Sequence, residues 1–476
     1  MEVSIDEKYE SRRGVPSVII NRFKFTRSYV HQDGLVTFRC VKKNQCKASV
    51  VTDASVSRVI SIDSVHSHDP LAIEIIEREK LRSKLKRKAQ EDPCTKPNKM
   101  IRQELGSAST SNLEHSDLNL IRKSMYASRR KLLPPIPKSI DECLKQIHDS
   151  QDAMKVKDQK FCYMSDNCSI PVFTTKENLS LLANAEHVIA DGTFTYAPKF
   201  FCQLYTIHVS KNGFHVPVVF AYLKNKTKEI YVQLWEIIKE LSLFLNGDNL
   251  HLKKLHVDFE KGAHAAATEV FNECEIVGCK FHLHQAWYRR IQKDKKIRKH
   301  FVKKTETGKW VKMFFGLSFL PPEMVYNAFT TLMYEAPLEG HEFSYYVLTN
   351  YIEEGCLFPP HIWAAAPPDN LLRTTNGAES YHADYNRQFY APHPNVHMVG
   401  YVLKEIQCET ALKITSIKKG SQNTIRSEVK HLTALLFECW EMFLEDRDVV
   451  KFLSDVANRY KPNSEELANG ESEDSA

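Results

Sequence analysis

The chain has 476 residues, of which 42% are hydrophobic and 10% aromatic. This length corresponds to about three domains, and the apolar content excludes a chain that is disordered throughout. The formal net charge is +6, a mild basic bias whose distribution matters more than its size. The 12 cysteines are scattered along the chain, which argues against a secreted disulfide scaffold and favours reduced thiols, some of them metal ligands. Because there is no long apolar run and no signal-peptide pattern, we expect a soluble intracellular protein that does not associate with membranes.

Residues 14–70 predict a small β-rich domain, because short apolar runs alternate there with turn residues. The expected strands cover residues 17–20, 23–29, 35–40 and 48–52. The same region contains two cysteines and two histidines with the spacing C-x5-C-x19-H-x-H, namely Cys40, Cys46, His66 and His68. These residue types are the usual ligands of structural zinc, and a domain too small for a large core often folds only with the metal. The pattern therefore predicts a Zn²⁺ site.

Residues 77–135 differ in composition and predict a linker with some helix rather than a core. A Ser/Thr/Asn-rich stretch lies near 106–112, and Pro134-Pro135-Ile136-Pro137 closes the region. A basic cluster near its start favours a nuclear-import signal or a contact with phosphates, and the alternative is a solvated charged surface. The cluster consists of Arg78, Lys80, Arg82, Lys84, Lys86, Arg87 and Lys88.

Residues 185–290 show an order of elements that can be assigned along the chain. The expected strands are 187–194, 201–210, 215–223, 252–258 and 275–281, and the expected helices are 229–245, 262–273 and one from about 284. Asn212-Gly213 predicts a tight hairpin turn. An antiparallel meander followed by right-handed crossovers is the order of a ribonuclease-H-like core, so the fold class is α/β with a mixed sheet.

The remaining sequence is mostly helical. Residues 291–370 are aromatic-rich and predict an all-α insertion, and helices resume between 376 and 459. The last residues are acidic with few apolar side chains, which predicts a disordered tail.

Three acidic residues occupy positions that favour catalysis. Asp191 and Asp258 each end a strand-like run, and Glu379 opens a helix-like stretch. Carboxylates from separate segments can converge on Mg²⁺ or Mn²⁺, and two such ions stabilise the attacking and leaving oxygens of a phosphodiester. Any one of these residues alone is better explained as a turn former or as solvated surface. Together with the fold order and the surrounding motifs, they favour a metal site.

The sequence from about 185 to 400 resembles the transposase domain of Mutator-like elements (the MULE domain). That family has a ribonuclease-H-like core with an Asp-Asp-Glu metal site, so the resemblance implies that the three acids are catalytic and bind Mg²⁺. The matching motifs are Asp191-Gly192-Thr193-Phe194 with Pro198, Asp258-Phe259-Glu260-Lys261-Gly262-Ala263, Gly278-Cys279-Lys280-Phe281-His282-Leu283-His284-Gln285-Ala286, and Asn376-x-x-Glu379-Ser380.

The third of these motifs contains Cys279 and His282, a Cys-x-x-His pair that recurs in the family between the second and third acids. One such pair cannot complete a tetrahedral zinc site, which needs four ligands. We therefore favour a buried thiol and a histidine that orients the active site over a second metal site.

The N-terminal domain resembles the FLYWCH-type zinc finger, a type that occurs together with Mutator-type cores. Phe38 stands where that family usually has tryptophan, and another aromatic side chain can fill the same core position. The matching residues are Phe23, Phe25, Phe38-Arg39-Cys40, Cys46-Lys47-Ala48 and His66-Ser67-His68.

Basic residues directly after the core are candidates for DNA contact. Arg289, Lys293, Lys296 and His300 have the spacing i, i+4, i+7, i+11, which places them on one face of a continuous helix, and Arg290 lies beside them. Such a face can bind phosphates. The alternative is a solvated charged surface.

The resulting domain organisation has six parts. They are residues 1–72, a FLYWCH-like DNA-binding finger; 73–140, a basic, partly helical or disordered linker; 141–290, the first part of the core; 291–370, the helical insertion; 371–460, the third carboxylate and C-terminal helices; and 461–476, a disordered acidic tail.

The resemblances imply a DNA transposase of the DDE type that cleaves phosphodiester bonds at element ends and transfers the strand into target DNA. The implied cofactors are Mg²⁺ or Mn²⁺ in the catalytic site and Zn²⁺ in the finger. The implied partners are double-stranded DNA, as terminal inverted repeats and target, and further copies of the chain, in the nucleus. The alternative is a domesticated DNA-binding regulator without cleavage activity. A plain ribonuclease-H-type nuclease is a third alternative, although it needs neither the finger nor the insertion.

Overall fold

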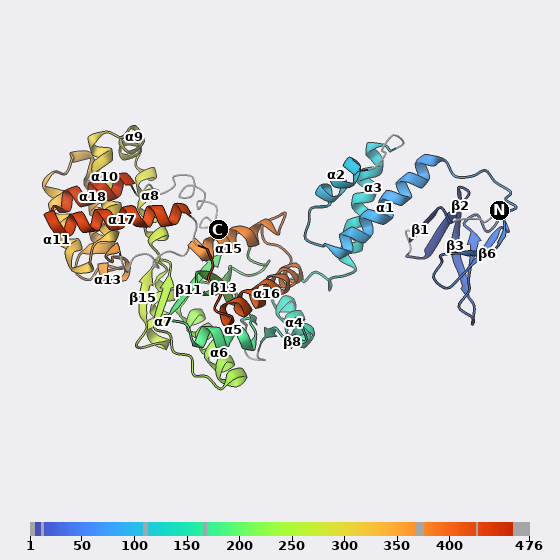
Figure 1. The fold of residues 1–476 in the computed structure, drawn as a ribbon, viewed down its shortest axis with the longest axis horizontal. Helices are drawn as coiled ribbons and strands as arrows, with labels where there is room; N and C mark the ends of the chain where they lie inside the picture. The colour runs from blue at the N-terminus through green and yellow to red at the C-terminus, as the bar shows by residue number, and fades with distance from the viewer. Residues whose placement is uncertain are drawn as a thin grey trace. The chain divides into compact units, whose positions relative to one another are not determined.

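A computed structural model describes residues 5–10, 14–107, 113–164, 169–367, 376–424 and 427–459. The chain forms two compact units, Met1–Ile136 and Pro137–Ala476 (Figure 1). Across the described ranges, no helix is both long enough and apolar enough to cross a membrane. The predicted acidic tail at 461–476 lies outside the described residues.

The first unit begins with an antiparallel sheet whose described strands follow one another in chain order. The four strands expected from the sequence are present within one residue at each end, and β1 and β6 add to them. The core contains Phe25, Phe38 and Val50, each fully buried, so Phe38 does fill a central aromatic position. The strands are β1 (Glu7–Glu10), β2 (Pro16–Ile20), β3 (Phe23–Val30), β4 (Val36–Cys40), β5 (Ser49–Thr52) and β6 (Val59–Asp63).

The region expected to be a linker instead forms helices with a core of their own. These helices are α1 (Ile73–Glu91), α2 (Pro97–Ser107) and α3 (His115–Arg130). Leu85, Ile121 and Met125 are fully buried between them. The apolar residues that build this core have helical spacing. Charged residues separate them in the sequence, and the high charge of the region led to the prediction of a linker.

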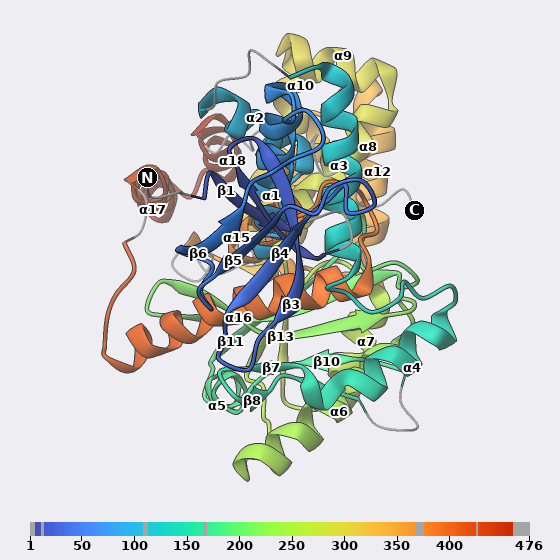
Figure 2. The same ribbon diagram turned by 90° about the vertical axis from the view of Figure 1, so that its right-hand side faces the viewer.

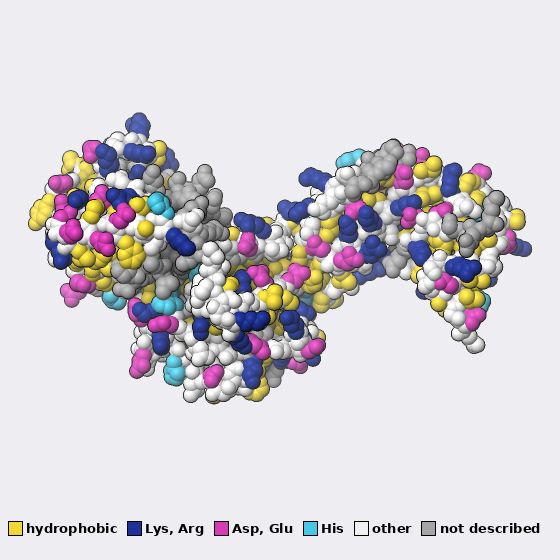
Figure 3. Space-filling view, viewed as in Figure 1, with side chains coloured by type: hydrophobic (Ala, Val, Ile, Leu, Met, Phe, Trp, Pro, Cys, Tyr) yellow, Lys and Arg dark blue, Asp and Glu magenta, His cyan; other side chains and the backbone are white. Residues whose placement is uncertain are grey.

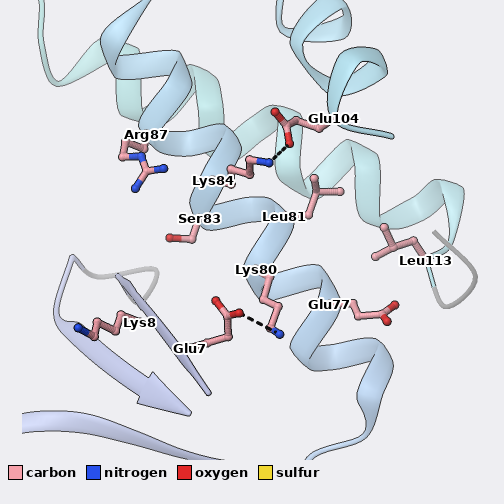
Figure 4. A pocket seen from close by; sticks show the side chains of 10 residues that line it. All are labelled: Glu7, Lys8, Glu77, Lys80, Leu81, Ser83, Lys84, Arg87, Glu104 and Leu113. Atoms are coloured by element: carbon pink, nitrogen blue, oxygen red, sulfur yellow. Dashed lines mark ion pairs between the residues drawn. The ribbon is translucent and has the colours of Figure 1, made fainter. Parts of the chain in front are cut away.

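The basic cluster of α1 is largely engaged in ion pairs inside this unit. Lys80 Nζ lies 2.9 Å from a carboxylate oxygen of Glu7 on β1, and Lys84 Nζ lies 2.5 Å from Glu104 on α2. Figure 4 shows both pairs at a pocket lined by residues of β1, α1 and α2. Pairs of this kind attach the sheet and the neighbouring helix to α1, so much of the cluster has a structural role. The others are Arg78–Asp117, Arg82–Glu79, Arg87–Glu91 and Lys88–Glu104.

The second unit contains a mixed sheet with the strand order β15-β14-β11-β12-β13-β10-β9 among its described strands. Strands β11 (His187–Thr193), β12 (Gln203–Lys211) and β13 (Phe214–Leu223) form an antiparallel meander, and β14 (Lys254–Val257) and β15 (Glu275–Gly278) run parallel to β11. Asn212 and Gly213 have positive φ angles of 54° and 75°, which confirms the hairpin turn between β12 and β13. The mixed α/β class is therefore as the sequence predicts.

Helices cover both faces of this sheet. Figures 1 and 2 show α6 (Lys228–Asn246) on one side and α15 (Asn376–Arg387) with α16 (Val396–Lys418) on the other. Helices α5 (Lys176–Ala183) and α7 (Lys261–Val270) join the apolar core on the α6 side. The other elements before β11 are α4 (Ile140–Ser150), β7 (Lys155–Val156), β8 (Gln159–Lys160), β9 (Cys162–Tyr163) and β10 (Val172–Phe173).

A second core in this unit is entirely helical. It combines the predicted insertion with the C-terminal helices, because Phe314 and Phe329 pack in one buried cluster with Phe452 and Leu453. The helices are α8 (Lys280–Lys293), α9 (Lys295–Lys303), α10 (Glu306–Gly316), α11 (Pro322–Tyr334), α12 (His341–Val347), α13 (Pro360–Trp363), α17 (Ser427–Asp446) and α18 (Val449–Arg459).

The predicted continuous basic helix after the core is wrong. Asp294 has an extended backbone with φ −92° and ψ 109°, and it ends α8 and caps α9. Its carboxylate accepts hydrogen bonds from the N–H groups of Lys296 and Ile297 at 2.8 and 3.2 Å. An N-cap aspartate satisfies the first free N–H groups of a helix. Lys293 and Lys296 therefore belong to different helices and do not share one helical face.

Candidate functional site

Four potential metal ligands meet in the N-terminal domain, where Cys40 ends β4, Cys46 follows that strand, and His66 and His68 follow β6. Among the described residues, the one group of three or more His, Cys, Asp or Glu side chains close enough to hold an ion is Cys40, Cys46, His66 and His68, whose ligand atoms all lie within 4.8 Å of one another. Cys40 Sγ lies 3.1 Å from His68 Nε2, and Cys46 Sγ lies 3.4 Å from His66 Nδ1. Tetrahedral zinc separates bound sulfur and nitrogen atoms by about 3.5 Å. The arrangement fits zinc, as the spacing of these residues predicts.

The surroundings of His66 and Cys46 favour the protonation states that bind metal, whereas burial raises the pKa of the Cys40 thiol. Burial lowers the pKa of His66, which keeps the ring neutral. Burial of Cys46 opposes its ionisation, but N–H groups of Ala48 and Ser67 and nearby side chains lower the pKa of the thiol to about 7. Phe23 stacks on the His66 ring with a centroid distance of 3.6 Å. Neutral imidazoles and thiolates are the forms that ligate zinc.

The two aspartates lie at the same edge of the second sheet. In the parallel pair of β11 and β14, Ile189 is opposite His256. Extending this register by two residues sets Asp191 level with Asp258, one residue beyond the end of β14. Carboxyl ends of neighbouring parallel strands meet at one edge, and alternate residues share a face. The register thus brings two of the three predicted acids to neighbouring positions.

Asp191 is buried, and its carboxylate has defined partners. Its Oδ1 accepts the N–H of Gly192 at 2.8 Å, and its Oδ2 lies 3.4 Å from Nδ1 of His382 on α15. Burial opposes ionisation, but the hydrogen bond and charge of His382, with contributions from His282 and Gly192, hold the pKa of the Asp191 carboxyl below its ordinary value. An ionised carboxylate in this position can serve as a metal ligand.

Asp258 is half-buried at the start of a short turn. Its side chain accepts the N–H of Glu260 at 3.2 Å, and its carbonyl oxygen lies 2.6 Å from Nε2 of His264. These contacts fix the turn that follows β14. Burial raises the pKa of the Tyr205 phenol well above its ordinary value, and the charges of Asp258, Glu260 and Asp191 raise it further. Both predicted aspartates therefore lie within electrostatic reach of one buried phenol.

Glu260 is a further acid at this edge that the sequence reading left without a role. The hydroxyl of Tyr231 donates to Glu260 Oε1 at 2.9 Å and accepts from Gln203 Nε2 at 2.6 Å. The Gln203 side chain is also the group that a Cβ on Gly192 would overlap. This chain of contacts links the turn after β14 to β11. It gives a structural reason for a glycine at position 192 and for a glutamate at position 260.

Helix α15 lies against the face of the sheet that carries Asp191. Its His382 also approaches the Thr206 hydroxyl on β12, at 2.9 Å from Nε2. Farther along the helix, the Tyr385 hydroxyl donates to the carbonyl oxygen of Tyr196 at 3.0 Å. Position 379 lies one turn before His382 on the same helix, and the side chain of Glu379 is outside the described residues.

Two further contacts hold the helix close to the sheet. The ring of Tyr381 lies 5.0 Å from that of His208 in an edge arrangement. Gly377 faces the ring of His215, and a Cβ at this position would overlap that ring. The closeness explains why glycine follows Asn376 in the fourth motif.

Cys279 and His282 lie beside the aspartates. Cys279 is buried, and its N–H donates to the Val257 carbonyl oxygen at 2.8 Å. His282, one turn into α8, is close enough to lower the pKa of Asp191. In the described part of the chain the pair belongs to no group of three close metal-ligand side chains. This environment agrees with a buried thiol and a histidine near the acids.

The predicted DNA-contact residues are dispersed over two helices. Arg289, Arg290 and Lys293 lie on α8, whereas Lys296 lies on α9. Arg290 Nη2 lies 3.5 Å from a carboxylate oxygen of Glu342, which offsets part of its charge. Lys293 and Lys296 are exposed.

Comparison with known families supports both sequence resemblances. Residues 8–68 match the FLYWCH zinc finger domain, and residues 187–286 match the MULE transposase domain. The second match contains both aspartates, Cys279 and His282, and it ends before Glu379. The chain therefore contains one region similar to the FLYWCH zinc finger domain and one similar to the MULE transposase domain. No curated protein sequence matches the chain significantly.

Several residues of this site were not predicted from the sequence. His382, Thr206 and His208 form a buried polar group beside Asp191, in which Nε2 of His208 lies 2.9 Å from the Thr206 hydroxyl. Thr206 and His208 are two positions apart on β12, so their side chains lie on the same face of the sheet. His382 could also have been recognised from the sequence. It lies three residues after Glu379, and residues at i and i+3 are neighbours on a helix.

Proposed function

We propose that this chain is a metal-dependent DNA transposase of the Mutator-like type. Asp191, Asp258 and Glu379 are its catalytic carboxylates, and it cleaves phosphodiester bonds at element ends and transfers the freed strand into target DNA. The observation that carries the proposal is the parallel register of β11 and β14, which sets the two aspartates level at one edge of the sheet.

The strand order supports a ribonuclease-H-like core. The meander β11-β12-β13, with β14 and then β15 added on the parallel side of β11, corresponds to the order inferred from the sequence. In open α/β sheets, ligands bind beyond the carboxyl ends of the strands. Asp191 near the end of β11 and Asp258 just beyond β14 occupy that position.

The contacts of α15 support the assignment of Glu379. His382 binds this helix to Asp191, and position 379 is one turn earlier. Side chains at i and i+3 are neighbours on a helical surface. The helix that carries the third acid is thus attached to the strand that carries the first.

The residues present fit Mg²⁺ or Mn²⁺, because ionised carboxylates are hard oxygen donors. Two such ions supply activation of the attacking water and stabilisation of the departing 3′ oxygen. Asp191, Asp258 and Glu379 would hold these ions beside the scissile phosphate, and His382 orients the Asp191 carboxylate. The freed 3′-OH then attacks a phosphodiester of the target DNA in the same site, and the new phosphodiester forms as the P–O3′ bond of the target strand breaks and leaves a target 3′-OH.

The finger supplies DNA binding in this proposal, with zinc held by Cys40, Cys46, His66 and His68. Its targets are the terminal inverted repeats of the element. The chain acts in the nucleus as a homo-oligomer assembled on DNA, so that two element ends are processed together.

A cleavage assay tests the proposal. Duplexes carrying the genomic sequence on either side of the gene are incubated with the purified chain and Mg²⁺ or Mn²⁺. Wild type is expected to nick and join them, and Asp258→Asn is expected to bind but not cut. Glu240→Gln, an exposed change on α6, is the matched control and should retain activity. Cleavage by Asp258→Asn at the wild-type rate overturns the assignment. Wild-type binding without cleavage in either metal supports the domesticated regulator instead.

A further inference from the structure

The helices between the finger and the core carry a basic surface that neither matched domain includes. We propose that the outer face of α2 and α3 is a second binding surface for the phosphate backbone of double-stranded DNA. The inference rests on the proposed DNA-binding function and adds a contact surface to it. The surface consists of Lys99 and Arg102 on α2 with Arg122, Lys123 and Arg130 on α3.

The separation of charges between the inner and outer faces carries this inference. The acids within α2 and α3 are Glu104 and Asp117, and both are buried. Asp117 lies 3.0 Å from Nη1 of Arg78, and Glu104 binds lysines of α1. Both acids are therefore neutralised by bases of α1. The outer face keeps its positive charges, and the exposed acids beside the two helices lie outside them, Asp92 before α2 and Glu114 at the N-cap of α3.

Helical spacing and one hydrogen-bonded arginine unite these bases in a single surface. On α3, positions 119, 122, 123, 126 and 130 follow the helical repeat, whereas Ile121 and Met125 point into the core. Arg122 donates from Nε to Asn98 of α2 at 2.7 Å and from Nη1 to Asn119 at 2.7 Å. Arg122 thus connects the outer faces of the two helices and is held in one orientation by two neutral partners.

The remaining bases are free to bind an external anion. Lys99, Arg102, Lys123 and Arg130 are exposed, and among the described residues no ion pair involves any of them. Figure 3 shows Lys and Arg side chains, with Asp and Glu side chains among them, over the part of the molecule where Figure 1 draws α1, α2 and α3. Unpaired bases on a rigid surface match the regular negative charge of a DNA backbone. The bases of α1, which the sequence suggested for this role, are instead largely used inside the unit.

The salt dependence of DNA binding tests this surface in the full-length, zinc-loaded chain. The probe is a labelled random-sequence duplex of about 30 base pairs, because phosphate contacts do not depend on sequence. The test variant combines Lys99→Gln, Arg102→Gln, Lys123→Gln and Arg130→Gln. Each lost phosphate contact should reduce the slope of log K against log salt by about 0.9, so we expect a reduction of about 3 to 4. The single variant Lys123→Gln should reduce the slope by about 1, with an unchanged melting temperature.

Two control variants separate the surface from general charge effects. Lys99→Arg with Lys123→Arg keeps the charge and should keep the slope. Lys80→Gln removes a base already paired with Glu7 and should also leave the slope unchanged. An unchanged slope in the fourfold variant overturns the inference, as does a reduction of equal size in Lys80→Gln. Tighter binding of duplex RNA through the same four residues overturns the assignment to DNA.

This measurement does not depend on catalysis. A chain that binds as expected but does not cut leaves the surface in place and contradicts the transposase activity. A chain that cuts DNA while the fourfold variant keeps the wild-type slope contradicts the surface alone. A wild-type chain that binds no duplex contradicts both.

Discussion

His382 Nδ1 lies 3.4 Å from Oδ2 of Asp191, and each side chain is only 6% exposed. The contact joins the strand that bears the first acid to the helix that bears the third, from segments far apart in the sequence. A histidine that orients a carboxylate ligand usually affects metal affinity and activity, since partners of metal ligands fix their position and basicity.

Replacement of His382 by Ala should therefore reduce strand cleavage by about 10- to 100-fold and raise the Mg²⁺ concentration needed for half-maximal rate. His382→Gln keeps a hydrogen-bonding group and should restore part of the loss. Cleavage rates across an Mg²⁺ titration measure the effect, with the exposed His431→Ala as control. A His382→Ala protein with the wild-type rate at low Mg²⁺ would show that the contact does not support catalysis.

The packing of α15 gives a second prediction. Ala is a better helix former than Gly by about 1 kcal/mol, yet Gly377→Ala should reduce both stability and cleavage because the new Cβ overlaps the His215 ring. Gly106→Ala, in α2, meets no atom within 4 Å and should be neutral or stabilising. Melting temperatures and cleavage rates of the two variants provide the comparison. Equal, stabilising effects at both positions would rule out close packing at Gly377.

Strands β11 to β15 of the second unit could be predicted from the sequence because their signals are local, whereas the two-residue strands β9 and β10 of the same sheet were not predicted. Apolar runs end at polar or turn residues, so the expected strands at 187–194 and 215–223 agree closely with β11 and β13. The two aspartates could be assigned to neighbouring strand ends for the same reason. The pairing of Ile189 with His256, which sets them level, is a long-range register that no local pattern specifies.

The errors arose where side-chain pairing decides the structure. The bases of α1 look solvated in the sequence, but partners such as Glu104 and Asp117 come from helices later in the chain. The prediction of a continuous basic helix was wrong because Asp294 ends α8 and its side chain caps α9. The charge spacing alone did not distinguish this cap from one more position within a helix. In both cases the role of a charged side chain depends on the groups that the fold brings next to it, and the local sequence pattern does not specify them.

Zinc removal gives a third prediction. Cys46→Ser should abolish the binding of one zinc per chain and unfold the N-terminal sheet, because small zinc domains fold with their metal. Metal analysis together with limited proteolysis of residues 8–68 measures both effects. Cys408→Ser changes an exposed cysteine outside the group and should retain the metal. Full zinc content in Cys46→Ser would contradict the ligand set.

The pH dependence of stability gives a fourth prediction. Burial, together with the charge of Lys280, lowers the pKa of His284 to about 3, and its Nε2 lies 3.0 Å from the Ser318 hydroxyl. The unfolded chain binds a proton below about pH 6.5 while the folded chain does not. The free energy of unfolding is therefore highest above about pH 6.5. It decreases as the pH falls, by about 2 kcal/mol at pH 5.

His284→Gln should remove this dependence, because glutamine can keep a hydrogen bond but does not titrate. Denaturant unfolding of the second unit at pH 7.5 and pH 5 gives the two free energies of unfolding. The difference between them should be smaller in the variant by about 2 kcal/mol. Identical differences in variant and wild type would mean that His284 is protonated alike in both states.

The position of bound metal tests the central proposal most directly. Crystals of the chain with duplex DNA and Mn²⁺ allow the ions to be located by anomalous scattering. We predict ions within coordination distance of the carboxylate oxygens of Asp191 and Asp258, with Glu379 as a further ligand, and their loss in Asp258→Asn. Saturating Mn²⁺ that binds elsewhere and leaves the two aspartates without an ion would contradict the catalytic assignment.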